Sequence, residues 1–176
     1  MKRIGIIVGH EPTKSGATSG TESEYSFNNK LAPQIATQLM LAGDFEPVII
    51  YRAHGYNELP KEVNKTGVDI AISLHCNAFN TKTSGCEVLY YGTSSNSRKL
   101  ASALQHTLVV ALGNKSRGAK GITAGDRGGS LLQKTSMPCV ISEAFFIDNQ
   151  EELANANKKL DKLAKAYADA VKAYYG

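Results

Sequence analysis

Three side chains with metal-binding or proton-transfer chemistry stand at the ends of short apolar runs. His10 and His75 carry imidazoles, and Glu143 carries a carboxylate. The runs before them are rich in β-branched residues and cover residues 4–8, 68–74 and 138–142. Such runs are typical of buried strands in a mainly parallel sheet, and in open α/β sheets ligands bind beyond the carboxyl ends of the strands. The pattern therefore predicts one site assembled at one edge of a sheet.

Imidazoles at this edge point to a metal. Neutral imidazole is the commonest metal ligand in proteins, and a catalytic Zn²⁺ typically takes three protein ligands and keeps one position open. Besides His10 and His75, the nearby acids are Glu11, Glu22 and Glu24. Glu24 shares a helix face with apolar residues, whereas Glu22 lies about 200° around the helix, so we expect Glu24 to point inward and Glu22 to face solvent. The apolar residues on the face of Glu24 are Phe27, Leu31 and Ile35.

Each of these residues has a structural alternative. Thr21 and Glu24 have the spacing of a capping box, with Thr21 as N-cap, in which Glu24 would only stabilise a helix start by about 1 kcal/mol. His10 could instead cap loop backbone groups, and His75 could be a hydrogen-bonded core residue. Glu11, next to His10, is expected to be solvated or to stand behind the ligands.

Glu143 has the surroundings of a general acid or base. It stands between Ser142 and the apolar residues 144–146, and a carboxyl group among apolar neighbours should have a raised pKa. Such a group can take a proton from an attacking water and deliver it to a leaving amine. The alternative is a buried acid that forms an ion pair with Arg52 or Arg127.

Strands and helices alternate along the chain. We expect strands over 4–8, 48–51, 68–74, 87–91 and 139–146, and helices over 21–41, 59–65, 97–112 and 150–175, the last broken near 155–157. Residues 117–130 hold five glycines, which is typical of a long functional loop. The expected fold class is α/β: a single domain over 1–176, with a mainly parallel twisted β-sheet flanked by helices on both faces.

The bulk properties exclude several function classes. Lys and Arg number 20 against 16 Asp and Glu, and the net charge of +4 suits an anionic polymer but is too weak to indicate nucleic acid. Cys76, Cys86 and Cys139 form no Cys-x-x-Cys pair, so we expect buried, reduced thiols. His54 and His106 are expected at the surface. No signal peptide or membrane-spanning run is visible, so we expect synthesis in the cytoplasm and no membrane insertion.

Five motifs, in chain order over nearly the whole sequence, carry a resemblance to a known family. They are Val8-Gly9-His10, Glu24 with Asn28 and Leu31, Tyr51-Arg52, Ser73-Leu74-His75-Cys76-Asn77-Ala78, and Met137-Pro138 followed by Ile141-Ser142-Glu143, Phe146 and Asn149. Together they resemble the zinc-dependent N-acetylmuramoyl-L-alanine amidases of the amidase_3 family.

The resemblance implies a site and a substrate. It implies that His10, Glu24 and His75 hold one Zn²⁺ and that Glu143 is the catalytic acid/base. The implied substrate is the amide between the lactyl group of N-acetylmuramic acid and L-alanine in peptidoglycan. Segments 85–91 and 117–120 are most similar to phage endolysins. This implies a monomeric lysin that is made in the host cytoplasm and acts on the wall after release, with a separate wall-binding domain if the parent chain is longer.

Two other functions are compatible with the same residues. A zinc peptidoglycan peptidase or carboxypeptidase would cleave between two amino acids. A non-catalytic wall-binding module would keep the fold without the chemistry. The intact set of His10, Glu24, His75 and Glu143 favours an enzyme over such a module.

Overall fold

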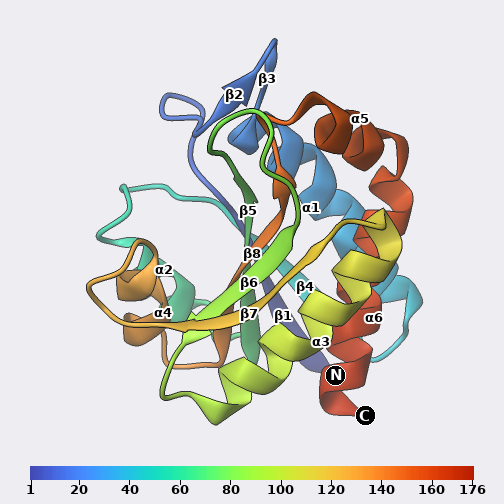
Figure 1. Ribbon diagram of the computed structural model, residues 1–176. Coiled ribbons are helices and arrows are strands. Elements are labelled where there is room, and N and C mark those ends of the chain that lie inside the picture. The colour runs from blue at the N-terminus through green and yellow to red at the C-terminus, as the bar shows by residue number, and fades with distance from the viewer.

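A six-stranded sheet runs through the middle of the computed structural model, which describes residues 1–176 (Figure 1). In sheet order the strands are β4 (Phe45–Ile50), β1 (Lys2–Val8), β5 (Ile70–Asn77), β8 (Cys139–Phe146), β6 (Cys86–Tyr91) and β7 (Ser116–Ile122). The first four run parallel, β6 is antiparallel to β8, and β7 is parallel to β6. The expected mainly parallel sheet is confirmed. A two-stranded ribbon, β2 (Thr18–Ser19) and β3 (Glu22–Ser23), lies apart from it.

Helices cover both faces of the sheet, as expected for this fold class (Figure 1). One face carries α1 (Glu24–Leu41), α3 (Ser95–Leu112) and α6 (Leu160–Tyr175), and the other carries α2 (Leu59–Lys65) and α4 (Gly129–Lys134). Helix α5 (Gln150–Lys158) leads from β8 to α6. None of the helices combines the length and apolar character that crossing a bilayer requires.

Strand β1 shows how the sheet is buried on both sides. Ile4, Ile6 and Val8 belong to the larger core of 34 buried residues, which includes α1, α3 and α6. Ile7 points the other way into a core of 10 buried residues, which includes α2 and α4. Successive side chains of a strand alternate between faces, so a strand covered on both sides reads as a continuous apolar run. This is why the central strands were visible in the sequence.

Helix α1 begins at Glu24, and the expected N-cap at Thr21 is wrong. The N-cap is Ser23, whose hydroxyl accepts from the Ser26 backbone N–H at 3.1 Å, while the Ser26 hydroxyl accepts from the Ser23 N–H at 2.8 Å. Residues 22–23 pair with 18–19 as a small ribbon, which holds them extended and delays the helix. Glu24 is therefore the first helical residue, at the end of α1 that meets the sheet edge.

Two further expectations about elements are wrong. Residues 117–130 are not one long loop, because most of this segment forms the edge strand β7 and the start of α4. The glycines and charges of β7 hid it, and its backbone is paired with β6 on one side only. The C-terminal helix is divided at Lys159 rather than near 155–157.

Candidate metal centre

His10 is delivered to the site by a strained turn after β1. Its φ is +67°, in the left-handed region that non-glycine residues rarely adopt. The preceding residue, Gly9, donates its N–H to the Leu74 carbonyl at 3.1 Å, and a Cβ at Gly9 would lie 2.8 Å from the ring of His75. The Gly9-His10 turn therefore packs against β5 more closely than any side chain at position 9 would permit, and the structure brings the two histidines together.

His75 lies near the end of β5 and faces the imidazole of His10. The two ring centroids are 4.9 Å apart with the planes at 69°. Burial lowers the pKa of His75, partly offset by the neighbouring Glu24 carboxylate. This favours the neutral imidazole, the form that binds a metal. The next residue, Cys76, points to the opposite face and belongs to the larger core, as strand alternation requires.

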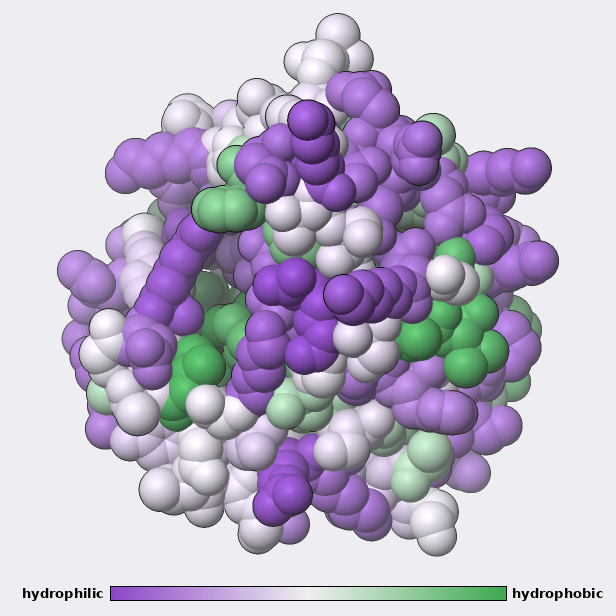
Figure 2. Space-filling view, viewed as in Figure 1, coloured by the Kyte–Doolittle hydropathy of each residue, from purple (hydrophilic) through white to green (hydrophobic).

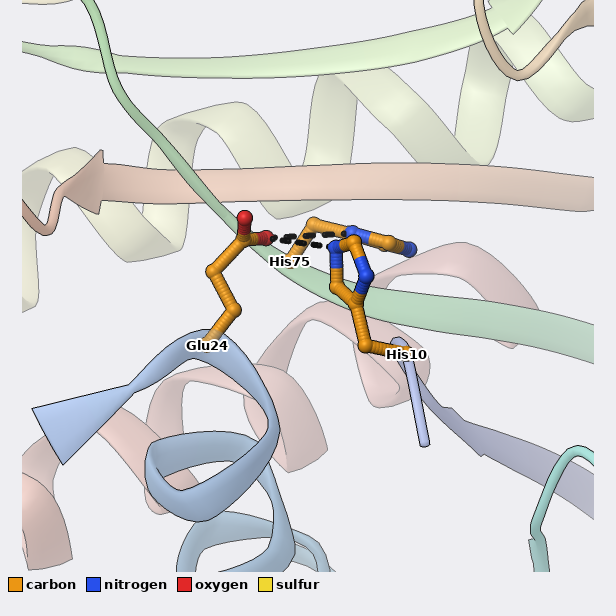
Figure 3. A group of neighbouring side chains, drawn as sticks. All are labelled: His10, Glu24 and His75. Atoms are coloured by element: carbon orange, nitrogen blue, oxygen red, sulfur yellow. Dashed lines mark hydrogen bonds and ion pairs between the residues drawn. The ribbon is translucent and has the colours of Figure 1, made fainter. Parts of the chain in front are cut away.

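Glu24 completes the cluster from the first turn of α1 (Figure 3). It is 2% exposed, and its Oε2 lies 3.3 Å from His10 Nε2 and 3.3 Å from His75 Nδ1. Two backbone groups hold the carboxylate in place: Ala17 N–H donates to Oε1 at 3.0 Å, and Cys76 N–H donates to Oε2 at 3.2 Å. Burial alone would raise the pKa of Glu24, but these contacts and the two histidines outweigh it and lower the pKa.

The expectation that Glu22 faces solvent from the helix that carries Glu24 is wrong, because Glu22 is not helical and its side chain is only 17% exposed. Glu24 points inward as expected, whereas Glu22 lies in β3, before the helix begins. The Glu22 carboxylate forms an ion pair with Lys30 and accepts from the Asn157 side chain, away from the histidines. Glu22 therefore takes no part in the cluster.

The donor set fits a divalent metal ion. One ligand atom from each of His10, Glu24 and His75 lies within 4.8 Å of the others. Ligand atoms around a tetrahedral Zn²⁺ lie roughly 3.3 Å apart, which matches the 3.3 Å from Glu24 Oε2 to each histidine nitrogen. His10 Nε2 is buried, and its 3.3 Å contact with Glu24 Oε2 lacks the geometry of a hydrogen bond. A nitrogen this enclosed is costly to leave without a partner, and a metal would supply one.

Gly16 closes the cluster from the loop before β2. Its φ is +80°, and a Cβ there would lie 2.7 Å from the His10 ring and 2.8 Å from Glu24 Oε1. The backbone at this position therefore touches two of the three donors directly. Only glycine combines that backbone conformation with that approach.

Glu143 stands beside the cluster in the sheet. On β8 it pairs in register with His75 of β5, and on its other side it pairs with Glu87 of β6. Neighbouring strands lie about 4.8 Å apart, so the three side chains form a row on one face. Burial, followed by the charge of Glu24, raises the pKa of Glu143 to about 8, and Arg127 opposes this shift. Its Oε2 is enclosed without a partner, and no ion pair with Arg52 or Arg127 forms.

Glu87 is a member of this row that the sequence analysis did not select. Its carboxylate forms ion pairs with Arg117 and Lys120 and accepts from the Asn77 side chain at 2.9 Å. Glu87 and Leu89 lie on the same face of β6 because side chains alternate along a strand. A carboxylate on a face that otherwise carries apolar residues was the signal in the sequence by which Glu87 could have been found. The two cations, not a metal, balance its charge.

His10, His75, Glu87 and Glu143 line one cleft of about 490 Å³ on the side of α2 and α4, whereas the buried Glu24 does not line it. Figure 2 shows a hollow on this side of the molecule, with hydrophilic residues along its rim and hydrophobic ones inside. The polar residues that line the cleft include His10, Arg52, Ser73, His75, Arg127 and Glu143. Two of the three donors, His10 and His75, are thus accessible from the cleft.

Comparison with known proteins identifies the family. Residues 4–173 match the model of the family described as N-acetylmuramoyl-L-alanine amidase. The chain belongs to this amidase family. The N-acetylmuramoyl-L-alanine amidase LytC of Bacillus subtilis (strain 168) is 30% identical over 180 residues, which are 98% of this chain and 35% of LytC. The endolysin of Bacillus phage SPP1 is 26% identical over 180 residues, which are 97% of this chain and 65% of the endolysin. The chain thus spans about a third of the length of LytC.

Solved structures of an endolysin catalytic domain and of an amidase have the same fold. The catalytic domain of the CD27L endolysin, which targets Clostridia difficile, is 30% identical with a TM-score of 0.83, covering 98% of this chain and 97% of that domain. The N-acetylmuramoyl-L-alanine amidase from Clostridium difficile 630 superposes with a TM-score of 0.88 at 23% identity, covering 99% of this chain and 96% of that one. The second likeness concerns the fold alone.

In this amidase-family chain, the remaining candidates lie outside the cluster. His54 is exposed, and its Nδ1 lies 2.6 Å from the Glu62 carboxylate. His106 is exposed on α3. Glu11 pairs through its backbone with Lys14 and contributes no donor to the cluster. The three cysteines are buried and free.

Proposed function

We propose that this chain is a zinc-dependent N-acetylmuramoyl-L-alanine amidase that cleaves the amide between N-acetylmuramic acid and the first stem residue, L-alanine, of peptidoglycan. One observation carries the proposal: His10 and His75, which form a donor cluster with Glu24, line the same cleft as the unpaired carboxyl group of Glu143. Membership of the amidase family supports the same bond as the target.

His10, Glu24 and His75 would hold the ion. Bound there, Zn²⁺ would lower the pKa of a water molecule towards about 7 and polarise the scissile carbonyl. The chain's own contribution is to fix the three donors. The Gly9 turn sets His10 against His75, and two backbone N–H groups orient the Glu24 carboxylate.

Glu143 would move the proton. Its carboxylate takes a proton from the attacking water as the new C–O bond forms at the carbonyl carbon. It then gives that proton to the alanine nitrogen as the C–N bond breaks, so that the amine leaves neutral. A group that must accept and then donate a proton works best with a pKa near the working pH, and burial raises the pKa of Glu143 from its ordinary value in that direction.

Replacing Glu143 tests this assignment. We expect Glu143→Ala to lose turnover on purified walls on the order of 10²–10⁴-fold, the usual contribution of general acid–base catalysis. Zinc content, measured by elemental analysis, should stay at one ion per chain because Glu143 is not a donor. The control is His106→Ala, at an exposed position on α3, the helix on the opposite face of the sheet from the cleft. Near wild-type cleavage by Glu143→Ala would overturn the assignment.

End-group analysis of digested walls separates the amidase from its alternatives. The proposed reaction exposes N-terminal L-alanine and no reducing sugar ends. A zinc peptidase would expose the amino group of a different residue. A wall-binding module would expose none and would sediment with the walls. Repeating the digestion with a chelator tests the metal requirement.

The relatives suggest a biological setting for the activity. Because two of the similar proteins are endolysins, we propose that the chain acts as a phage lysin, made in the host cytoplasm and released onto the wall. Buried free thiols agree with folding in a reducing compartment. LytC and the SPP1 endolysin extend beyond the matched region, and in a longer parent a further domain would bind the wall. Lysis of a producing host only when a membrane-permeabilising protein is co-expressed would support this setting, and spontaneous export would contradict it.

A further inference from the structure

One flank of the cleft carries polar groups that the protein leaves without partners. Arg52 follows β4, and its Nε is enclosed without a hydrogen bond. The Tyr56 hydroxyl and the Ser73 hydroxyl are also enclosed and unpartnered, and all three residues line the cleft. Buried polar groups are nearly always hydrogen-bonded in native proteins, so three polar groups without hydrogen-bond partners in one cleft indicate a ligand.

Arg52 is held in place without being neutralised. Its guanidinium lies 5.3 Å from the centre of the Tyr56 ring, an interaction that fixes the cation and leaves its hydrogen-bond donors free. No carboxylate of the chain forms an ion pair with Arg52, in contrast to Arg117, which is paired with Glu87. A guanidinium with free donors is suited to bind a carboxylate.

Two of the three acids that line the cleft are engaged elsewhere. Glu87 is balanced by Arg117 and Lys120. Asp126 accepts from the Thr123 backbone N–H at 2.7 Å and from its hydroxyl at 2.9 Å. The third acid, Glu143, forms no ion pair with Arg52. No carboxylate of the chain therefore neutralises Arg52, and an anion bound in the cleft would do so.

The position of Arg52 relates this anion to the scissile bond. Arg52 comes two residues after Ile50, which pairs in register with Ile7 of β1, and β1 leads directly to His10. Ser73 is on β5, two residues before His75, and therefore on the same face. The unpartnered groups thus lie next to the donor cluster, on the side away from Glu87 and Arg117.

We propose that Arg52, Tyr56 and Ser73 form a subsite for the α-carboxylate of the second residue of the stem peptide. In peptidoglycan that residue is D-glutamate linked through its γ-carboxyl group, and its α-carboxylate is the first charge on the peptide side of the scissile amide. Two residues of extended chain span at most about 7 Å, so this charge falls within a cleft of this size. In some walls this group is a neutral carboxamide. The subsite would therefore make the protein prefer walls that carry the α-carboxylate over walls that carry the carboxamide.

Paired substrates test the subsite. The zinc-loaded protein is given soluble muramoyl-L-alanyl-γ-D-glutamyl-L-lysine or the same compound with a D-isoglutamine residue, and kcat/KM is measured for each. We expect the wild type to prefer the carboxylate on the order of ten- to one-hundred-fold, the usual effect of a charge-assisted hydrogen bond. Arg52→Gln should bring the ratio close to one, and Arg52→Lys should keep part of it because the charge remains.

Arg127→Gln is the matched control, because Arg127 lines the same cleft but is exposed and stands at the start of α4. We expect Arg127→Gln to keep the wild-type ratio of kcat/KM between the two substrates, because a positive charge that does not contact the α-carboxylate would not distinguish it from the carboxamide. Three results would overturn the subsite: a wild-type ratio within twofold of one, an equal loss on both substrates in Arg52→Gln, or an erased ratio in Arg127→Gln.

The ligand named here rests on the proposed function, and a binding measurement separates the two. Calorimetry with the dipeptides L-alanyl-γ-D-glutamate and L-alanyl-D-isoglutamine requires no turnover. If the acid binds more tightly and Arg52→Gln removes the difference while neither muropeptide is cleaved, the subsite stands and the amidase proposal fails. If the muropeptides are cleaved and neither assay shows discrimination, the subsite fails and the amidase proposal stands.

Discussion

Gly16 is the position where a single methyl group should disturb the metal centre without removing a donor. A Cβ there would lie 2.7 Å from the His10 ring and 2.8 Å from Glu24 Oε1. Ordinary van der Waals contact begins at 3.4 Å, so the two donors in Gly16→Ala must retreat by roughly 0.6–0.7 Å. Metal–ligand distances tolerate deviations of only about 0.2 Å. The required shift is about three times that tolerance.

The magnitude follows from this mismatch. Disturbing the groups that position metal ligands typically costs 10–100-fold in metal affinity, and we expect a loss of that size for zinc in Gly16→Ala. The backbone adds a separate cost, because alanine in the left-handed region is destabilised by about 1–2 kcal/mol. Stability and metal affinity should therefore both fall, for different reasons.

Gly20→Ala separates these two causes. Gly20 also has a positive φ, +58°, but nothing lies within 4 Å of its Cβ position. Both variants should lose about 1–2 kcal/mol in urea unfolding of the metal-free protein, and only Gly16→Ala should lose zinc to a competing chromophoric chelator. If Gly16→Ala holds zinc within twofold of Gly20→Ala, the reasoning about donor spacing is refuted.

Three further outcomes are expected. In the metal-free protein, burial raises the pKa of Glu143 from 4.5 to about 8, so the folded state keeps a proton that the unfolded state has released, and the free energy of unfolding should fall as pH rises from 5 to 9. One pKa unit corresponds to about 1.4 kcal/mol, and the open cleft screens part of the shift. Urea titrations should therefore show the free energy of unfolding falling by about 2 kcal/mol over this pH range, and the fall should be absent in Glu143→Gln. If Glu143→Gln shows the same pH dependence as the wild type, the assignment of the raised pKa to Glu143 is contradicted. Removing zinc with a chelator should lower the melting temperature, because an ion present at about 1,000 times its Kd stabilises the fold by about 4 kcal/mol, and identical melting curves would argue against a bound ion. Leu104→Ala in α3, at a fully buried site, should cost about 2–5 kcal/mol in urea unfolding, whereas Val110→Ala on the same helix, 70% exposed, should cost less than about 0.5 kcal/mol; equal losses would be inconsistent with the packing described.

Features that depend on local pattern could be predicted from the sequence. The central strands are apolar on both faces, so they appear as runs, and the residues that follow those runs are at the sheet edge by necessity. This is enough to select His10, His75 and Glu143. The period of α1 places Glu24 on the buried face with Phe27, although the helix starts later than its capping pattern suggests. Their assignment as ligands and acid/base stays a prediction.

Features that depend on contacts between distant segments required the tertiary structure. The strand β7 carries glycines and charges instead of an apolar run, and it is a strand because β6 supplies its hydrogen bonds. Glu87 enters the site row because β6 pairs antiparallel with β8. Arg52 stays free because Glu87 and Asp126 are engaged elsewhere and the fold forms no ion pair between Arg52 and Glu143. By itself the sequence determined which residues could do chemistry, since side-chain type and period are local properties. Their neighbours and their unpaired charges were decided only by the fold, because strand order and cleft shape depend on contacts between segments far apart in the chain.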